Sequence, residues 1–394
     1  MVDFKMMKRI AALLICAALI AGCNAASSQT EPASSSQPAQ SSQQEQKQYT
    51  YQNPDPDMVM ITSPGGDITY KDYRLYIDIG EKLSRYTARQ QMAICHTLEK
   101  DFANMGITIN EEEFKQVSEE QMLTITAYSP AIMQELKDIA EIAGMTEEEV
   151  IAAMRMGFRS DYLITQLGNY FQGIAAEEFV EPAEGYTLPE NAAQLSAEEV
   201  NAYKEYQKQQ LIYEAAMQKM GEYSQNYDSR LTFDNEDALA TLDGEVIPYT
   251  DEAKNYIDYA GIAARIDSID FIHAGEFALR ELNRLGKEID EAAVAENTKM
   301  YIESMVANSE TMESMAEFCK DFGATTDDYF KALERPMMVE EAGNRYYEMV
   351  ADEYYEMLDN TPKDEFKYNT PDEYFVECMA KLLEGSEVVN IMGK

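Results

Sequence analysis

Three groups of side chains in this 394-residue chain have the residue types and spacings of possible metal-binding or catalytic sites. His96 and Glu99 stand three residues apart, so on a helix they would share one face and could hold a metal ion. The stretch DNEDALATLDG, residues 234–244, is rich in carboxylates, which are the groups that bind calcium. Asp327 and Asp328 form an acidic pair. Each group would need further partners at defined positions.

The sequence does not supply those partners. No other ligand is placed near His96, which we interpret as a hydrated surface histidine. Residues 234–244 lack the glycine that an EF-hand loop requires at its sixth position, and the acidic pair at 327–328 suits the positive end of a helix dipole. No serine has a nucleophile elbow or a histidine partner. We therefore expect no enzyme, no catalytic residue, no metal and no cofactor.

The N-terminus has the parts of a secretory signal peptide. Lys5, Lys8 and Arg9 precede the apolar run IAALLICAALI, which is short for a membrane span. The run ends in Ile20-Ala21-Gly22-Cys23, which resembles the lipobox of bacterial lipoproteins. The resemblance implies that residues 1–22 are removed and that Cys23 carries lipid. The alternative is an ordinary thiol beside a signal peptide.

Residues 23–57 are expected to link that anchor to a folded body. Their composition is Ser, Gln, Pro, Ala and Thr with almost no large apolar residues, so they cannot bury enough surface to fold. A flexible chain of this length has a root-mean-square span of roughly 30 Å. We therefore expect a lipid-anchored protein whose body stands off the extracytoplasmic face of the cell membrane.

Charge excludes some classes of partner. The formal net charge is −40, which repels nucleic acid and anionic lipid, and no glycine-rich loop is present to cradle a phosphate. Cys95, Cys319 and Cys378 are the cysteines beyond the lipobox, and they show no metal-binding spacing. One disulfide is possible and none is required.

Most of the chain has the apolar periodicity of helices. Helical spacing runs through residues 70–225 and 250–385, whereas strand-like alternation appears only at 58–62, 240–249 and 387–392. Capping boxes are expected at Thr146 with Glu149, Ser196 with Glu199, and Thr370 with Glu373. The sequence therefore predicts a mainly α protein with a few short β-strands.

The sequence also repeats itself at a spacing of about 180 residues. Residues 76–111 laid on 256–291 give seven identities in 36 positions. The matched pairs are Tyr76/Tyr256, Ile77/Ile257, Asp78/Asp258, Arg85/Arg265, Gly106/Gly286, Ile109/Ile289 and Glu111/Glu291. A glycine turn precedes both blocks, and a Gly-x-Thr-acidic helix start follows both. The alternative explanation is that helical proteins in general share such turn and cap residues. Four features occur in the same order in both blocks, however, and this favours a true repeat.

These motifs resemble the helical N-terminal domain of the SurA/PrsA family of extracytoplasmic chaperones, and the client-binding region of trigger factor is similar. The residues that carry the resemblance are Gly66, Ile68, Thr69, Gly106, Ile107, Ile109, Glu111, Gly144, Thr146 and Glu149. The segment 371–391 resembles the returning helix and strand that close the chaperone lobe. The resemblance implies two tandem related modules, at 58–235 and 236–394.

The chain departs from that family in one respect. Such foldases usually insert a parvulin-type prolyl isomerase domain with a glycine-rich sheet and histidines at its active site. Here the only histidines, His96 and His273, fall within expected long helices, and no glycine-rich segment separates the repeats. Isomerase activity is therefore not implied.

The methionine and tyrosine content of the chain indicates a binding surface. The chain has 24 methionines and 26 tyrosines but no tryptophan, a composition that suits adaptable apolar recognition. In residues 345–358 we interpret Tyr347, Val350, Tyr354 and Leu358 as a core stripe. Exposed client contacts are predicted at Tyr346, Tyr355, Met122 and Tyr128.

The predicted function is ATP-independent holding of unfolded or newly exported polypeptides by a membrane-anchored protein. Its predicted partners are those polypeptides and, through Cys23, the lipid bilayer, with no nucleic acid. Two alternatives remain open. One is a solute-binding lipoprotein of a transporter, which normally needs α/β lobes. The other is a structural or adhesive surface lipoprotein.

Overall fold

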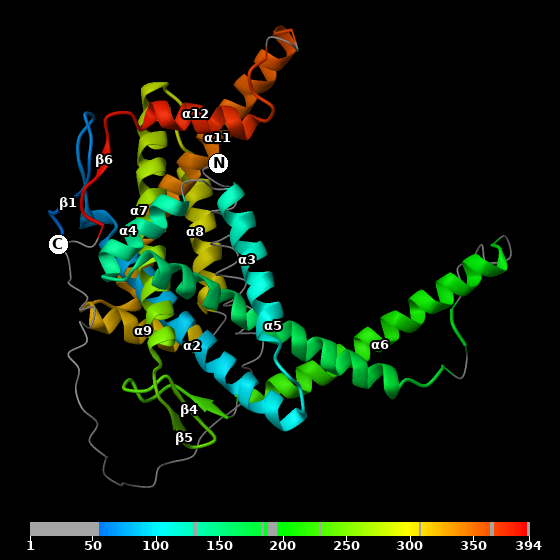
Figure 1. Ribbon diagram of the computed structural model, residues 1–394. Coiled ribbons are helices and arrows are strands. Elements are labelled where there is room, and N and C mark those ends of the chain that lie inside the picture. Colours follow the sequence, from blue (N-terminus) through cyan, green and yellow to red (C-terminus); the bar gives the residue numbers. More distant parts are fainter. Residues whose placement is uncertain are drawn as a thin grey trace.

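The computed structural model describes residues 55–128, 132–182, 185–187, 195–228, 230–306, 309–362 and 366–391. Within these residues the chain is mainly helical, and its few strands are short, as Figure 1 shows. This confirms the predicted class of a mainly α protein with a few short strands. None of the described helices is long and apolar enough to cross a lipid bilayer. The predicted signal peptide, Cys23 and nearly all of the predicted tether lie outside the described residues.

The same order of elements occurs twice along the chain. In the first repeat the elements are β1 (Val59–Thr62), β2 (Ile68–Thr69), α2 (Arg74–Met105), α3 (Glu111–Tyr128), α4 (Ile132–Ala143), α5 (Glu147–Glu177) and α6 (Ala197–Asp228). In the second they are β4 (Ala240–Leu242), β5 (Glu245–Ile247), α7 (Asp251–Arg284), α8 (Glu291–Val306), α9 (Ser309–Asp321), α10 (Thr326–Ala332), α11 (Glu334–Asn360) and α12 (Pro371–Leu382). The pair α10 and α11 takes the place of α5. Strands β3 (Leu231–Thr232) and β6 (Glu387–Val388) end the two repeats.

Matching residues begin and end the matching helices. Gly106 follows α2 and Gly286 follows α7, with φ of 74° and 67°, values that glycine adopts without strain. Thr146 begins α5 and Thr325 begins α10, and each forms a capping box with the acidic residue three positions later. The helix boundaries are therefore set by local interactions that both repeats contain.

Each repeat ends in a strand that pairs with the hairpin of the other repeat. β6 runs antiparallel to β1, with Glu387 opposite Thr62. β3 runs antiparallel to β4, with Leu231 opposite Leu242. The result is two three-stranded sheets, β2-β1-β6 and β3-β4-β5, at opposite ends of the body (Figure 1). The predicted strand segments correspond to β1, to β4 with β5, and to β6; neither β2 nor β3 was predicted.

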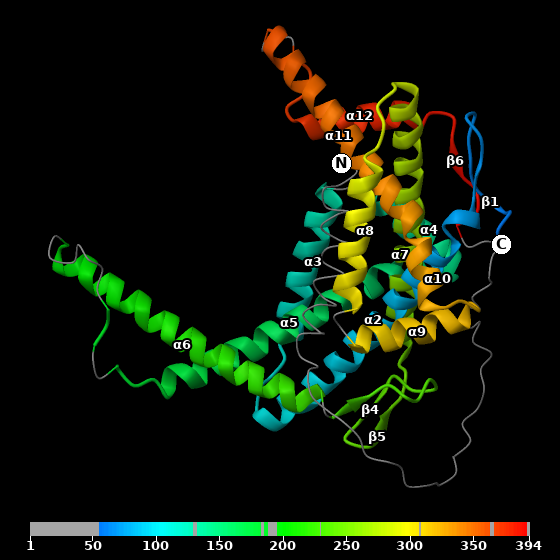
Figure 2. The same cartoon turned by 180° about the vertical axis from the view of Figure 1, so that it is seen from behind.

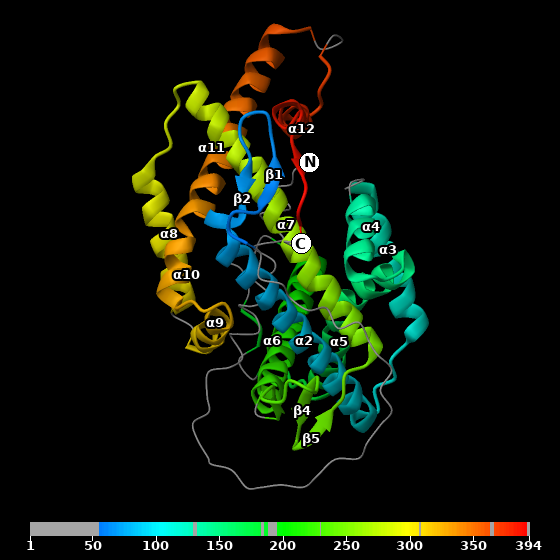
Figure 3. The ribbon, with the colours of Figure 1, turned by 90° about the vertical axis from the view of Figure 1, so that its left-hand side faces the viewer.

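The hydrophobic cores are shared between the repeats in the same way. The central helices α2 and α7 pack along each other; α4 and α5 also pack on α7, whereas α9 and α10 pack on α2. Figure 3 shows α3 and α4 on one side of the α2–α7 pair and α8, α9 and α10 on the other. One core joins Met60 and Ile77 to Ile272 and Val339. The predicted boundary at 235/236 separates two repeats of sequence, but we correct the prediction of two modules in tandem, because each repeat completes the core and the sheet of the other.

Reciprocal ion pairs cross the contact between the two central helices. Arg265 on α7 donates to Asp78 on α2, with Nη1 3.0 Å from Oδ1. Arg85 on α2 donates to Asp258 on α7. Asp78/Asp258 and Arg85/Arg265 are matched pairs of the sequence repeat, so each aspartate contacts the arginine of the other repeat. The repeat is therefore present in the packing as well as in the sequence.

The crossing is not fully symmetric. Glu81 on α2 accepts from both arginines, at 3.0 Å from Arg85 Nε and 3.0 Å from Arg265 Nη1. The position 180 residues later is Gly261, where a Cβ would collide with the Arg85 side chain. One repeat thus supplies the shared carboxylate, and the other supplies the space that Arg85 occupies.

The histidines differ in environment, and this predicts a pH effect. His96 is exposed, whereas His273 lies with Nε2 2.8 Å from Ser386 Oγ and its ring against Phe277. Burial and the nearby charge of Arg280 lower the pKa of His273 from the usual 6.5. As the pH falls below about 6.5, the unfolded chain binds a proton at His273 more readily than the folded state does. The stability that this residue contributes therefore falls as the pH falls.

We therefore expect His273→Gln to reduce the loss of stability between about pH 7.5 and about pH 5.5. The measurement is the urea midpoint at each pH. His96→Gln is the matched control and should leave the difference as in the wild type. Equal pH dependence in the wild type and in His273→Gln would contradict the prediction.

Candidate functional site

The structure divides the four predicted client contacts. Tyr355 on α11 is 54% exposed, as expected for a contact residue. Tyr346 is only 7% exposed and packs against Phe375 of α12, so its prediction as an exposed contact is wrong. The buried stripe of α11 runs through Tyr346, Val350 and Tyr354, while the Tyr347 hydroxyl reaches Asp372 at 2.8 Å. Helix α12 packs against both Tyr346 and Tyr347, and this explains why Tyr346 is buried.

The predicted contacts on α3 are not confirmed. Met122 is 8% exposed and packs with Leu136 of α4, Met154 of α5 and Ile262 of α7, so it is a core residue. The side chain of Tyr128 lies outside the described residues. Met122 and Tyr346 belong to different hydrophobic cores, so these two do not form a common surface.

A helical hairpin provides a more extensive candidate surface. Helices α5 and α6 pack along each other and project from the body, as Figures 1 and 2 show from opposite sides. The α5–α6 hairpin is thin, because the end of α5 meets the middle of α6 in a small cluster of Ala175, Ile212 and Ala216 with Phe171 and Phe179. Lys208 of α6 lies over Phe179, which follows α5, so the first part of α6 extends beyond the end of α5 (Figure 1) and leaves much of its circumference exposed.

Helix α6 presents apolar side chains on that exposed part. Tyr206 is 60% exposed, Tyr213 53% and Met217 46%. Their spacings of seven and four residues place them in one line along the helix. This line, which we name the α6 seam, lies beside the buried face of Ile212 and Ala216 and does not coincide with it. The α6 seam is the candidate binding surface.

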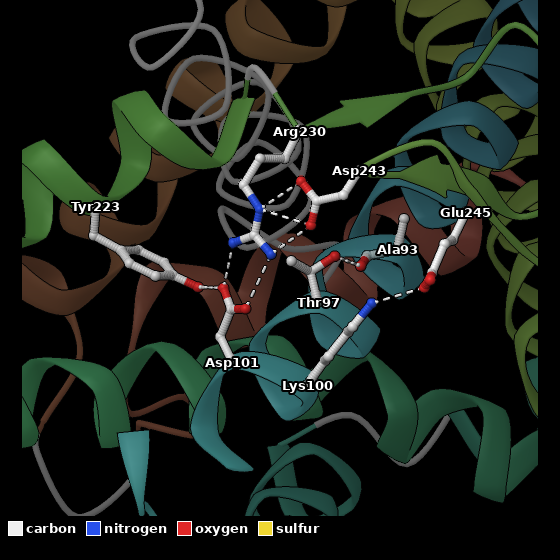
Figure 4. A network of polar contacts seen from close by, with 8 residues as sticks. All are labelled: Ala93, Thr97, Lys100, Asp101, Tyr223, Arg230, Asp243 and Glu245. Carbon is white, nitrogen blue, oxygen red and sulfur yellow. Dashed lines mark hydrogen bonds and ion pairs between the residues drawn. The ribbon is translucent and has the colours of Figure 1, made fainter. Parts of the chain in front are cut away.

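A polar network fixes the base of the hairpin to the body, as Figure 4 shows. The Tyr223 hydroxyl at the end of α6 donates to Asp101 Oδ2 of α2, at 2.7 Å. Arg230, just after α6, donates to the same oxygen at 2.7 Å and to Asp243 Oδ2 at 2.9 Å. Asp243 lies in the turn between β4 and β5, so one guanidinium joins the central helix, the hairpin and the sheet.

The electrostatics of this network favour its charged form. Burial, together with the hydrogen bond to the Asp101 carboxylate, raises the pKa of Tyr223, so its hydroxyl keeps the proton that it donates. The hydrogen bond from Arg230 lowers the pKa of Asp243. Both shifts favour the form in which Tyr223 donates and Asp243 is charged, and the contacts join the base of the hairpin to α2 and to the β4–β5 turn.

Sequence reasoning missed the α6 seam, although a signal was present. Residues 203–220 contain more apolar residues than one buried face requires, and Tyr206, Tyr213 and Met217 form a line of their own beside Ile212 and Ala216. Periodicity shows that two lines exist, but it does not show which of them a neighbouring helix covers.

Metal-binding side chains and thiols were the other chemical groups that the sequence singled out. Among the described residues there is no group of three or more His, Cys, Asp or Glu side chains arranged to hold a metal. Cys95, Cys319 and Cys378 are free thiols. No family model, curated protein or solved structure matches the chain. Its function is therefore inferred from the sequence and the geometry.

Proposed function

We propose that this protein is a membrane-anchored extracytoplasmic chaperone that holds unfolded or newly exported polypeptides without ATP and without prolyl isomerase activity. The α6 seam carries the proposal. A projecting helix with exposed tyrosine and methionine side chains can bury the apolar residues of a chain that has not yet folded. Tyrosine offers an apolar ring with a polar tip, and the methionine thioether adapts to irregular surfaces.

The sequence resemblances support the same proposal. The SurA/PrsA-like motifs suggest two related helical modules, here completed by exchange of strands and helices. The lipobox-like tetrapeptide suggests an anchor at Cys23, and the tether suggests a body held near the membrane where exported chains emerge. These are proposals about the chain, and the α6 seam supplies the surface on which they would act.

The alternatives have less support. A solute-binding lipoprotein normally has α/β lobes around a central sheet, whereas the sheets here have three short strands each and lie at the ends of a helical body. A structural or adhesive lipoprotein would need one fixed partner, and no feature of the described residues favours one.

The proposal predicts a loss of holding activity when the α6 seam is made polar. The seam variant combines Tyr206→Gln, Tyr213→Gln and Met217→Gln. The chain from residue 24 onward should slow the aggregation of several unrelated unfolded proteins, and the seam variant should need at least about tenfold more protein for the same effect. Light scattering during dilution from denaturant measures both.

Leu211→Gln is the matched control. Leu211 is also an exposed apolar residue of α6, at 40%, but it lies off the seam. This variant should hold clients as the wild type does. The proposal fails if the wild-type chain protects none of the test proteins.

A further inference from the structure

The charges around α6 are arranged unevenly with respect to the seam. Its three lysines, Lys204, Lys208 and Lys219, lie on the opposite side of the helix from the seam. Two of them are engaged with the neighbouring segment: Lys219 pairs with Glu178 at 2.8 Å, and Lys208 lies over the ring of Phe179. The charged side chain nearest the middle of the seam is Glu214, which is exposed.

From this arrangement we infer that the α6 seam docks a basic amphipathic helix: a client segment that places apolar residues on one face and lysine or arginine beside them. The inference rests on the proposed function, since it names the class of client that the seam selects. Tyrosine rings without a local cation attract ammonium and guanidinium groups, and a carboxylate at the edge adds to that attraction.

The spacing of the seam suits a helix in particular. Tyr206 and Met217 are eleven residues apart, which is about 16 Å along the axis. A partner helix presents side chains at the same intervals of three, four and seven residues, so its apolar face meets the seam at each position. It would also cover part of α6 where this helix extends beyond the end of α5.

Charge argues against one other occupant, and composition argues against a second. A second copy of this chain would bring the same acidic surface, and a net charge of −40 per molecule opposes the pairing of two identical seams. The chain's own segment from 24 to 54 consists mainly of Gln, Ser, Ala and Pro and has no apolar periodicity, so it has no face to bury. A basic amphipathic segment of another polypeptide meets both requirements.

Three synthetic peptides test the inference against the chain from residue 24 onward. The first is a leucine–lysine peptide with helical periodicity, the second replaces lysine by glutamate, and the third keeps lysine but has two central prolines that prevent a helix. Fluorescence anisotropy of labelled peptides gives the affinities. We expect the first peptide to bind at least tenfold more tightly than the other two, and the seam variant to lose at least tenfold for the first peptide.

Controls separate seam docking from attraction to an acidic protein in general. Leu211→Gln should bind the leucine–lysine peptide as the wild type does. Equal binding of the helical and proline-containing lysine peptides, or unchanged binding by the seam variant, would overturn the inference while leaving aggregation suppression to be judged separately. Conversely, seam-dependent peptide binding with no suppression of aggregation would refute the holding function and keep the docking site.

Discussion

Replacing Arg265 by alanine is expected to lower the free energy of unfolding by about 3–5 kcal/mol. The Arg265 side chain is fully buried between the central helices, where it contacts Asp78 and Glu81, each at most 2% exposed. Its Nε also donates to the carbonyl of Ile391 at 2.6 Å, which ties down the segment after β6. Removal of the guanidinium takes the 3.0 Å arginine partner from buried Asp78 and one of two arginine partners from buried Glu81, and it frees that segment.

The repeat provides the control for this prediction. Arg85 is the matching arginine, but its side chain is 19% exposed and that of its partner Asp258 is 33% exposed, so water can compensate for its loss. Arg85→Ala should therefore destabilise the protein clearly less than Arg265→Ala in urea titrations followed by circular dichroism. The double variant Arg265→Ala with Asp78→Asn should lose less than the sum of the single losses. A larger loss for Arg85→Ala would contradict the assignment of Arg265 as the buried centre.

A second large effect is expected at Gly275, where α7 passes closest to α11. A Cβ at this position would lie 2.6 Å from the carbonyl oxygen of Val339 and 2.7 Å from its Cβ. Val339 is fully buried on a helix backbone that cannot move without shifting the core between α7, α11 and α12. Gly275→Ala should therefore cost about 1–3 kcal/mol, despite the better helix propensity of alanine.

Gly343 on α11 is the matched control, because it is also a helical glycine but a Cβ there meets no atom within 4 Å. Gly343→Ala should leave stability unchanged or raise it by up to about 1 kcal/mol through helix propensity alone. Thermal or urea unfolding of the two variants separates the effects. If both substitutions stabilise the protein, α7 and α11 do not approach as closely as the structure shows.

The Arg265 prediction concerns a contact between the repeats, whereas Gly275 and Val339 both belong to the second repeat. The contacts between the repeats have a consequence for the proposed function. The α5–α6 hairpin leaves the body from a base built by both repeats, since Asp101 and Tyr223 come from the first and Asp243 from the second. Damage at the central crossing is therefore expected to reach the α6 seam through the orientation of the hairpin. The seam variant, by contrast, changes only exposed residues and should fold as the wild type does.

The sequence alone determined the helical class, the positions of most elements, and the turn and cap residues of the repeat. The cap of α3 by Asn110 and the capping box at Thr146 span three residues each, so both partners stand side by side in the sequence. Alternation and turn residues likewise marked three of the short strand segments. Interactions of this range depend on residue type and spacing, and both can be read directly from the sequence.

Only the tertiary structure decided which repeat completes which sheet and which apolar line is covered. Arg265 and Asp78 are 187 residues apart, and their pairing follows from how α2 and α7 cross. Periodicity placed Tyr347 in the core stripe of α11 and Tyr346 outside it, but α12 packs against both rings and Tyr346 is the one that is buried. The same holds for the two apolar lines of α6, because burial depends on the surface that a neighbouring element offers, and a local pattern of residues contains no information about that neighbour.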